Sequence, residues 1–125
     1  MADDLNVDIC VIGAGSGGLS VAAGASQMGA STVLIEKGKM GGDCLNYGCV
    51  PSKALIASAK AAHAQRNASQ YGVKDAPGVV DFAAAKDHVA DVIAQIAPVD
   101  SQERFEDLGV RVIREYGRFI SRDEV

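Results

Sequence analysis

Apolar residues in the first part of the chain form two short runs, separated by a stretch of small residues. The first run, 6–12 (NVDICVI), and the second, 32–35 (TVLI), each predict a buried strand. Between them, 13–18 predicts a glycine-rich turn and 19–28 an alanine-rich helix that stops at Gly29. A strand, a helix and a strand within about 30 residues predict a right-handed parallel crossover.

The remaining pattern adds helices and further extended segments. Residues 52–66 predict a helix with Pro51 at or near its first turn, and residues 67–80 predict a polar connection. The next helix is capped by Asp81 and interrupted at Pro98. A short helix then begins at the acidic capping box 100–103 and ends near Leu108. Strands are expected at 110–113 and 116–120. The order predicts an α/β fold, a Rossmann-like parallel sheet flanked by helices. Residues 121–125 fall where a turn and another strand are expected.

The turn after the first strand carries a nucleotide-binding pattern. Gly13-Ala14-Gly15-Ser16-Gly17-Gly18 fits G-x-G-x-x-G. In that pattern Gly13 permits the turn, Gly15 lets the backbone approach a pyrophosphate, and Gly18 lets helix and strand pack closely. The N–H groups near Ser16 and Gly17 then face the phosphates at the positive end of the helix. The alternative is a glycine-rich turn with no ligand.

Glu36 follows the second strand, about 20 residues after the turn, where an acid accepts both ribose hydroxyls of a dinucleotide. The alternative for Glu36 is a surface acid. A carboxylate there disfavours a 2′-phosphate, so FAD or NAD fits this site and NADP fits poorly.

Cys44 and Cys49 enclose four residues, including Asn46 and Gly48, which tolerate unusual backbone angles. The pair favours a redox-active disulfide, because so short a loop can close a reducible bond and a helix start lowers a thiol pKa. A metal site and two structural thiols are the alternatives, although zinc needs four ligands and no second pair has suitable spacing. Cys10, inside an apolar strand, is interpreted as a buried core residue.

Composition and charge limit the classes of protein and of binding partner that the sequence allows. A chain of 125 residues with 48% hydrophobic residues is one domain of ordinary size with a real core. The net charge of −4 comes without a basic run, so we expect no nucleic-acid partner. No apolar run reaches the roughly 20 residues of a membrane span, and no signal peptide is recognisable, so we expect a cytoplasmic protein without a membrane partner. Cysteine pairs in that compartment are more often catalytic or metal-binding than structural.

Residues 41–53 (GGDCLNYGCVPSK), together with the glycine turn and Glu36, resemble the flavin-dependent pyridine nucleotide-disulfide oxidoreductases. This is the family of dihydrolipoamide dehydrogenase, glutathione reductase and mercuric reductase. The resemblance covers essentially all of residues 1–125, which look like the N-terminal part of an FAD-binding domain. It implies that the NAD(P)H-binding and dimerisation domains of a homodimeric parent enzyme lie outside the chain.

The resemblance implies particular roles. Cys44 would be the thiol that attacks substrate, Cys49 the thiol beside the flavin that forms a charge-transfer complex, and Lys53 a neighbour of flavin N5. The segment of Tyr116 and Gly117 would run past the adenine of the cofactor. The candidate cofactor-binding residues are Gly13, Gly15, Ser16, Gly17, Gly18, Glu36, Lys37, Gly42, Asp43, Cys49, Lys53, Tyr116 and Gly117.

Two residues depart from the family pattern. Asp43 replaces the usual Thr, and a carboxylate near a pyrophosphate would need a proton, a water or a cation. Tyr47 replaces a common Val, which alters the substrate mouth. The family's catalytic histidine is expected beyond residue 125, so His63 and His88 are interpreted as ordinary surface or core residues.

The implied reaction passes electrons from NAD(P)H through FAD to a Cys44–Cys49 disulfide, and on to a small-molecule disulfide or to a metal ion such as mercuric ion. The stretch 101–110 leans toward mercuric-reductase-like members, whereas Lys53-Ala54-Leu55 resembles dihydrolipoamide dehydrogenases. We expect no full turnover from the 125 residues alone. The alternatives are a non-enzymatic dinucleotide-binding module and a thiol redox switch without flavin.

Overall fold

A parallel sheet forms one end of the molecule. The computed structural model describes residues 4–125 and contains β1 (Ile9–Ile12), β2 (Thr32–Ile35) and β3 (Arg111–Ile113), in the order β1-β2-β3. Ile9 lies opposite Thr32, and Val33 lies opposite Arg111. Helix α1 (Ser16–Gln27) connects β1 to β2, which confirms the predicted parallel crossover.

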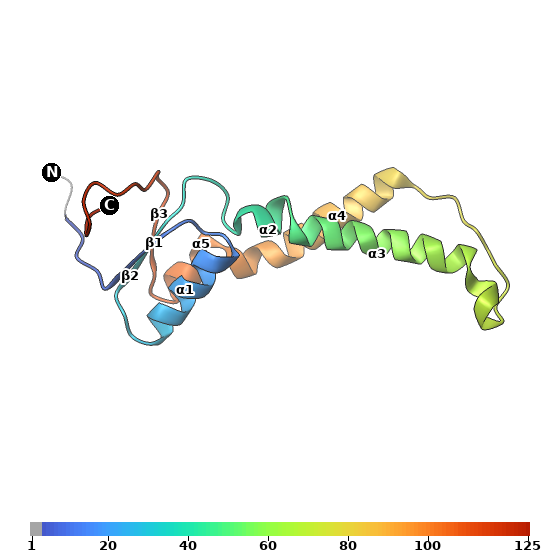
Figure 1. Cartoon of the computed structure of the whole chain (residues 1–125), viewed down its shortest axis with the longest axis horizontal. Helices are drawn as coiled ribbons and strands as arrows, with labels where there is room; N and C mark the ends of the chain where they lie inside the picture. Colours follow the sequence, from blue (N-terminus) through green and yellow to red (C-terminus); the bar gives the residue numbers. More distant parts are fainter. Residues whose placement is uncertain (1–3) are drawn as a thin grey trace.

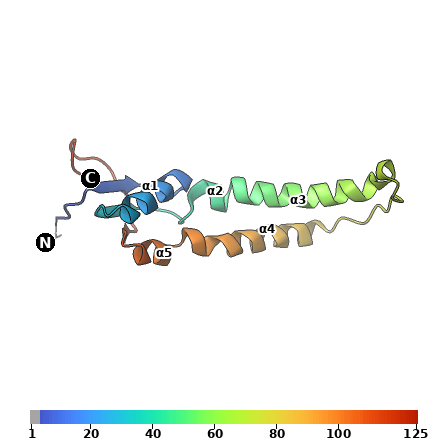
Figure 2. The ribbon, with the colours of Figure 1, turned by 90° about the horizontal axis from the view of Figure 1, so that it is seen from below.

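The other end is a helical hairpin. Helix α3 (Cys49–Arg66) and helix α4 (Phe82–Ile96) lie side by side and project away from the sheet (Figures 1 and 2). Shorter elements are α2 (Gly42–Asn46), α5 (Gln102–Asp107) and the 3₁₀ turns η1 (Ala68–Tyr71) and η2 (Ala97–Asp100). Along residues 4–125, no helix combines the length and the apolar character that a membrane span requires.

The core lies between the sheet and the helices α1 and α5. Phe105, Leu34 and Val110 are its largest fully buried side chains, and Val11 and Leu19 pack with them. In contrast, α4 has no buried residue and α3 has only Ala54. The apolar runs of the sequence therefore supply one compact core at the sheet, and the hairpin contributes little to it.

The first strand is shorter and more exposed than expected. It covers Ile9–Ile12 and not residues 6–12, and only Val11 of its residues is buried. Cys10 is exposed, so its interpretation as a buried core residue is wrong. The reason is that Cys10 and Ile12 point to the opposite face from Val11, and within residues 4–125 that face is largely uncovered.

The strand expected at 116–120 is absent from the described part of the chain. Tyr116, Phe119 and Ile120 are exposed, and the backbone N–H of Ile120 donates to Glu124 at 3.0 Å in a turn. Among residues 4–125, no neighbouring strand is placed to form the backbone hydrogen bonds that this segment would need to become a strand.

Helix boundaries follow the caps. Asp81 accepts a hydrogen bond from the Ala84 N–H at 3.0 Å and caps α4, as predicted. Helix α3 begins at Cys49, three residues before the expected start, and α1 begins at Ser16 inside the expected glycine turn. The short helix α5 is capped by Ser101 and not by Asp100.

Candidate functional site

The glycine turn between β1 and α1 is held by close backbone contacts. Gly13 has a φ of +101°, and its N–H donates to the Ile35 carbonyl at 2.8 Å. A Cβ added at Gly18 would stand 1.8 Å from the Gly13 carbonyl oxygen. Both positions therefore require glycine for the fold itself, and the predicted reason for Gly18, close packing of helix and strand, is confirmed.

Gly15 and Gly17 have no such structural reason. Gly15 has extended backbone with a φ of −81°, and a Cβ at either position would meet nothing within 4 Å. Gly15 is the N-cap residue of α1, and no side chain of residues 4–125 caps this helix start. An open surface of glycine beside free N–H groups fits a pyrophosphate, so the residues present fit a dinucleotide such as FAD.

The Glu36 carboxylate links two turns, one at the carboxyl end of β1 and one at the carboxyl end of β2, by hydrogen bonds to both. Its Oε2 accepts the Ala14 N–H at 2.6 Å, and its Oε1 accepts the Gly38 N–H at 2.5 Å. Each carboxylate oxygen can accept a second hydrogen bond, so the carboxylate keeps the acceptor capacity that the predicted contact with ribose hydroxyls needs. Glu36 thus positions the glycine turn through the Ala14 N–H.

Residues expected at the adenosine end gather beside Glu36. The Nζ atom of Lys37 lies 5.0 Å from the centroid of the Tyr116 ring, a cation–π contact. Gly117 passes close to the side chains of Ile35 and Ile12, where an added Cβ would come within 3.2 Å of Ile35. Arg114, which sequence reasoning missed, donates to the Gly38 carbonyl and fastens this segment to the turn after β2.

The cysteine segment packs directly on the nucleotide turn. Gly42 has a φ of +56°, and a Cβ there would lie 2.7 Å from the Gly15 Cα. Asn46 tolerates unusual backbone angles but is helical here, and it donates through Nδ2 to the carbonyls of Met40 and Gly42, at 3.0 and 2.8 Å. Gly42 therefore brings α2 against the glycine turn, and Asn46 fixes the loop that leads into α2.

The two cysteines face each other across the junction of α2 and α3, and both are free thiols. A side-chain hydrogen bond between Cys44 and Cys49 is the first cause that raises the pKa of the Cys44 thiol, and partial burial adds to it. The positive charge of Lys53 lowers the same pKa, but by less. The pKa of Cys44 is therefore raised, and not lowered as the position at a helix start led us to expect, because the partner thiol opposes ionisation more than Lys53 favours it.

The two unusual residues of the motif lie on the exposed side of α2. Asp43 is exposed in the first turn of α2, where the helix dipole favours a carboxylate. Tyr47 is 69% exposed, and Lys39 places its Nζ atom 5.4 Å from the centroid of the Tyr47 ring. Both departures from the family pattern therefore leave the contact between the thiols intact.

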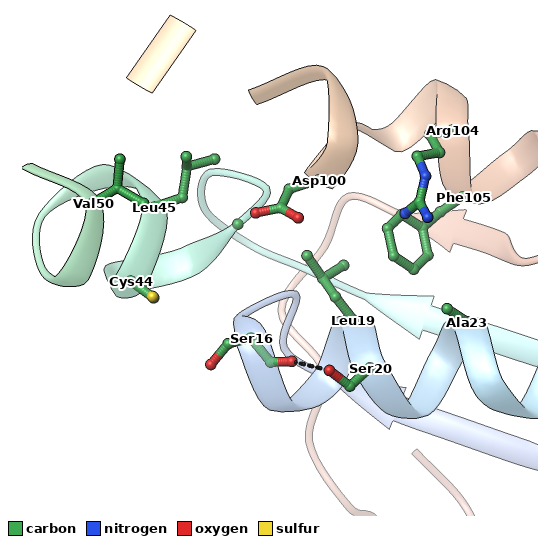
Figure 3. A pocket seen from close by; sticks show the side chains of 11 residues that line it. Ser16, Leu19, Ser20, Ala23, Cys44, Leu45, Val50, Asp100, Arg104 and Phe105 are labelled. Carbon is green, nitrogen blue, oxygen red and sulfur yellow. Dashed lines mark hydrogen bonds between the residues drawn. The ribbon is translucent and has the colours of Figure 1, made fainter. Parts of the chain in front are cut away.

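A cavity of about 330 Å³ opens beside Cys44 (Figure 3). Helix α1 supplies Ser16, Leu19, Ser20 and Ala23, and the segment around α2 supplies Gly41, Cys44, Leu45 and Val50. The far wall consists of Asp100, Arg104 and Phe105. Sequence reasoning missed that wall, because it lies more than fifty residues after the cysteines in the chain.

The sequence-predicted residues thus form two neighbouring groups. The glycine turn, Glu36, Lys37, Tyr116 and Gly117 gather at the carboxyl ends of β1 and β2, where parallel α/β sheets bind ligands. Cys44, Cys49 and Lys53 gather at the start of the hairpin, joined to the first group through Gly42. His63 and His88 are exposed on α3 and α4, away from both groups.

This arrangement defines a Rossmann-like α/β domain with a thiol pair beside the glycine turn that follows β1. The sequence profile described as pyridine nucleotide-disulphide oxidoreductase matches residues 7–124. The chain belongs to this family of flavin-dependent oxidoreductases.

Individual relatives agree with that assignment. A dihydrolipoyl dehydrogenase of Haloferax volcanii is 47% identical over 89 residues, which are 71% of this chain and 18% of the relative. A mercuric reductase of Streptomyces lividans is 37% identical over 111 residues, 88% of this chain and 22% of the relative. The chain thus spans about a fifth of the length of these curated relatives.

A solved structure shares the fold. It is described as the Cu(II) complex of the HOCl-induced flavoprotein disulfide reductase RclA from Escherichia coli, and it matches with a TM-score of 0.70 at 24% identity. The match covers 90% of this chain and 23% of that one.

Proposed function

We propose that residues 1–125 are the N-terminal part of an FAD-binding domain whose Cys44–Cys49 pair relays electrons between a flavin and a substrate. The packing of the cysteine segment on the glycine turn is the observation that carries this proposal: a Cβ at Gly42 would lie 2.7 Å from the Gly15 Cα. The raised pKa of Cys44, caused chiefly by Cys49, is consistent with two neighbouring thiols in that segment. A pair of structural thiols would have no reason to lie against a phosphate-binding turn.

FAD fits the residues that would hold it. The open surface at Gly15 and Gly17 would receive the pyrophosphate, Glu36 the ribose, and the Lys37–Tyr116 region the adenine end. Bound FAD supplies two-electron transfer between a nicotinamide and the cysteine pair. Lys53, one turn after Cys49 in α3, would place its positive charge beside the flavin end of the site.

Cys44 is the thiol that meets the substrate in this proposal, because it lines the cavity next to α2. Its pKa is raised, so the thiol mostly holds its proton at neutral pH; loss of the proton to solvent is slow to supply the attacking thiolate, and a nearby base would accelerate it. The two described histidines lie exposed on α3 and α4. The proposal therefore assigns the base to the histidine that the family resemblance places beyond residue 125.

The electron acceptor is a small-molecule disulfide or mercuric ion. Relatives with the names dihydrolipoyl dehydrogenase and mercuric reductase both support this pair of classes, and neither decides between them. For the whole protein we propose NAD(P)H as donor, bound outside this chain, and a cytoplasmic homodimer. The 125 residues alone should show no full turnover.

Controlled oxidation tests the thiol pair. One equivalent of diamide should join Cys44 to Cys49, as mapped by peptide mass spectrometry, and dithiothreitol should reverse the bond. Cys10 is the internal control: it is an exposed thiol on the sheet and should stay reduced. Oxidation that leaves Cys44 and Cys49 as thiols while Cys10 reacts would count against the relay.

A further inference from the structure

Asp100 lacks the role that the sequence pattern assigned to it. The cap of α5 is Ser101, whose Oγ accepts from the Arg104 N–H at 3.2 Å and donates to the Pro98 carbonyl at 2.8 Å. Within residues 4–125 the Asp100 carboxylate has neither a hydrogen-bond donor nor an ion-pair partner. A charge without a partner is thus held at the end of η2.

That charge shares a cavity with Cys44. Figure 3 shows the Asp100 carboxylate pointing toward the space between Leu19 and the helix that carries Cys44. Much of the remaining wall is apolar, including Leu45 and Phe105. A carboxylate beside an apolar wall acts on a bound charge more strongly than one on an open surface.

Arg104 also lines the cavity and keeps its positive charge. Its Nη1 donates to the Val99 carbonyl at 2.8 Å, and its Cζ lies 5.4 Å from the centroid of the Phe105 ring. Figure 3 shows the guanidinium beside Phe105, on the side of Asp100 away from Cys44, so the Asp100 carboxylate is the charge that lies toward Cys44.

We propose that Asp100 determines the specificity of the site, favouring disulfides with a positive charge next to the S–S bond over disulfides with carboxylates there. This inference rests on the proposed function, since it takes Cys44 as the thiol that meets the substrate. The inference specifies the charge of the preferred substrate, and neither the family assignment nor the thiol pair gives that information.

The reaction that reads out the preference is thiol–disulfide exchange. The Cys44 thiol loses its proton to solvent, and its Sγ attacks one sulfur of R–S–S–R, forming a Cys44–S–R bond and releasing RS⁻. Cys49 then loses its proton to solvent, and its Sγ attacks the Cys44 sulfur, which breaks the Cys44–S–R bond, closes the protein disulfide and releases the second RS⁻. The substrate gains two electrons, and the cysteine pair loses two.

The test measures the first step alone, in a chain with Cys49→Ser and Cys10→Ser so that Cys44 is the remaining thiol. The probes are cystamine, which is dicationic, dithiodipropionate, which is dianionic, and neutral hydroxyethyl disulfide. Rates of mixed-disulfide formation, followed by mass spectrometry, are expressed relative to the neutral probe, which cancels any change in the reactivity of Cys44. Asp100→Asn is compared with Asp107→Asn, an exposed acid of α5 outside the cavity, so that both variants change the net charge equally.

We expect the ratio of the cystamine rate to the dithiodipropionate rate to fall about 3- to 10-fold in Asp100→Asn and to change less than about 2-fold in Asp107→Asn. The fall should shrink at high salt. An unchanged ratio in Asp100→Asn, or equal changes in both variants, overturns the inference, while the proposed function survives if the wild-type pair still closes its disulfide. Failure of Cys44 to react with all three probes overturns both.

Discussion

The sheet end and the helical hairpin are built on different principles. The sheet end buries Leu34, Phe105 and Val110 almost completely, and its turns depend on backbone contacts too close for a side chain. The hairpin buries only Ala54 in α3 and nothing in α4. The glycine turn belongs to the first region and the thiols to the base of the second, so substitutions can alter the core and the thiol pair separately.

The largest effect is expected at the backbone contact inside the glycine turn. Gly18→Ala places a Cβ 1.8 Å from the Gly13 carbonyl oxygen, which the turn cannot relieve without separating α1 from β1. We expect a loss of about 5 kcal/mol, comparable with the whole stability of a small domain. Urea unfolding followed by circular dichroism measures it.

Gly17→Ala is the matched control, because a Cβ at Gly17 meets nothing within 4 Å and lies inside α1. It should gain about 0.5–1 kcal/mol from helix propensity. Equal destabilisation by the two substitutions would show that the contact at Gly18 is not what holds the turn.

Two phenylalanines compare the regions directly. Phe105 is 1% exposed in the core, so Phe105→Ala should cost about 3–5 kcal/mol of unfolding free energy. Phe82, at the start of α4, is 63% exposed, and Phe82→Ala should change it by no more than about 0.5 kcal/mol. A large loss from Phe82→Ala would mean that the hairpin carries a share of the core that its exposure does not suggest.

A smaller effect is expected at the cap of α4. Asp81→Ala removes the hydrogen bond to the Ala84 N–H, which should cost about 1 kcal/mol. Because α4 buries no residue, the loss should appear as faster amide exchange in its first turns, with the amides of β1 and β2 unchanged. Faster exchange across the whole sheet would argue against the independence of the two regions.

The smallest change should leave the fold intact and alter only the thiol. Cys49 is the first cause of the raised pKa of Cys44, so Cys49→Ala should move the pH profile of Cys44 alkylation to lower pH. Lys53→Gln removes a charge that lowers this pKa, so its profile should move to higher pH. Iodoacetamide rates in a Cys10→Ser background measure both shifts.

Lys60→Gln is the control, since Lys60 lies on α3 about two turns beyond Lys53 and should leave the profile in place. An unchanged pH profile of Cys44 alkylation in Cys49→Ala would mean that the two sulfurs do not interact.

Local signals in the sequence predicted local structure well. The parallel crossover, the glycine at position 18 and the Asp81 cap all depend on residues close in the chain, and the structure confirms them. The exposure of Cys10 could not be predicted, because it depends on whether another segment covers that face of the sheet.

Long-range features of the site escaped prediction for the same reason. Asp100 lines the cavity of Cys44 only because α5 folds back against α1. The sequence pattern also does not decide which of the adjacent residues Asp100 and Ser101 caps α5. Likewise, the raised pKa of Cys44 comes from its distance to Cys49, which spacing along the chain does not fix.

The most direct test of the central claim is the visible absorption spectrum of the chain with FAD, before and after dithiothreitol, in wild type and in Cys49→Ser. If Cys49 lies beside the flavin, reduction should bring a long-wavelength charge-transfer band in the wild type that is missing in Cys49→Ser. Bound flavin with no such band in the wild type, or with the same band in both proteins, would contradict the placement of Cys49 at the flavin. A chain that takes up no FAD would contradict the proposal that residues 1–125 hold the cofactor through the glycine turn and Glu36.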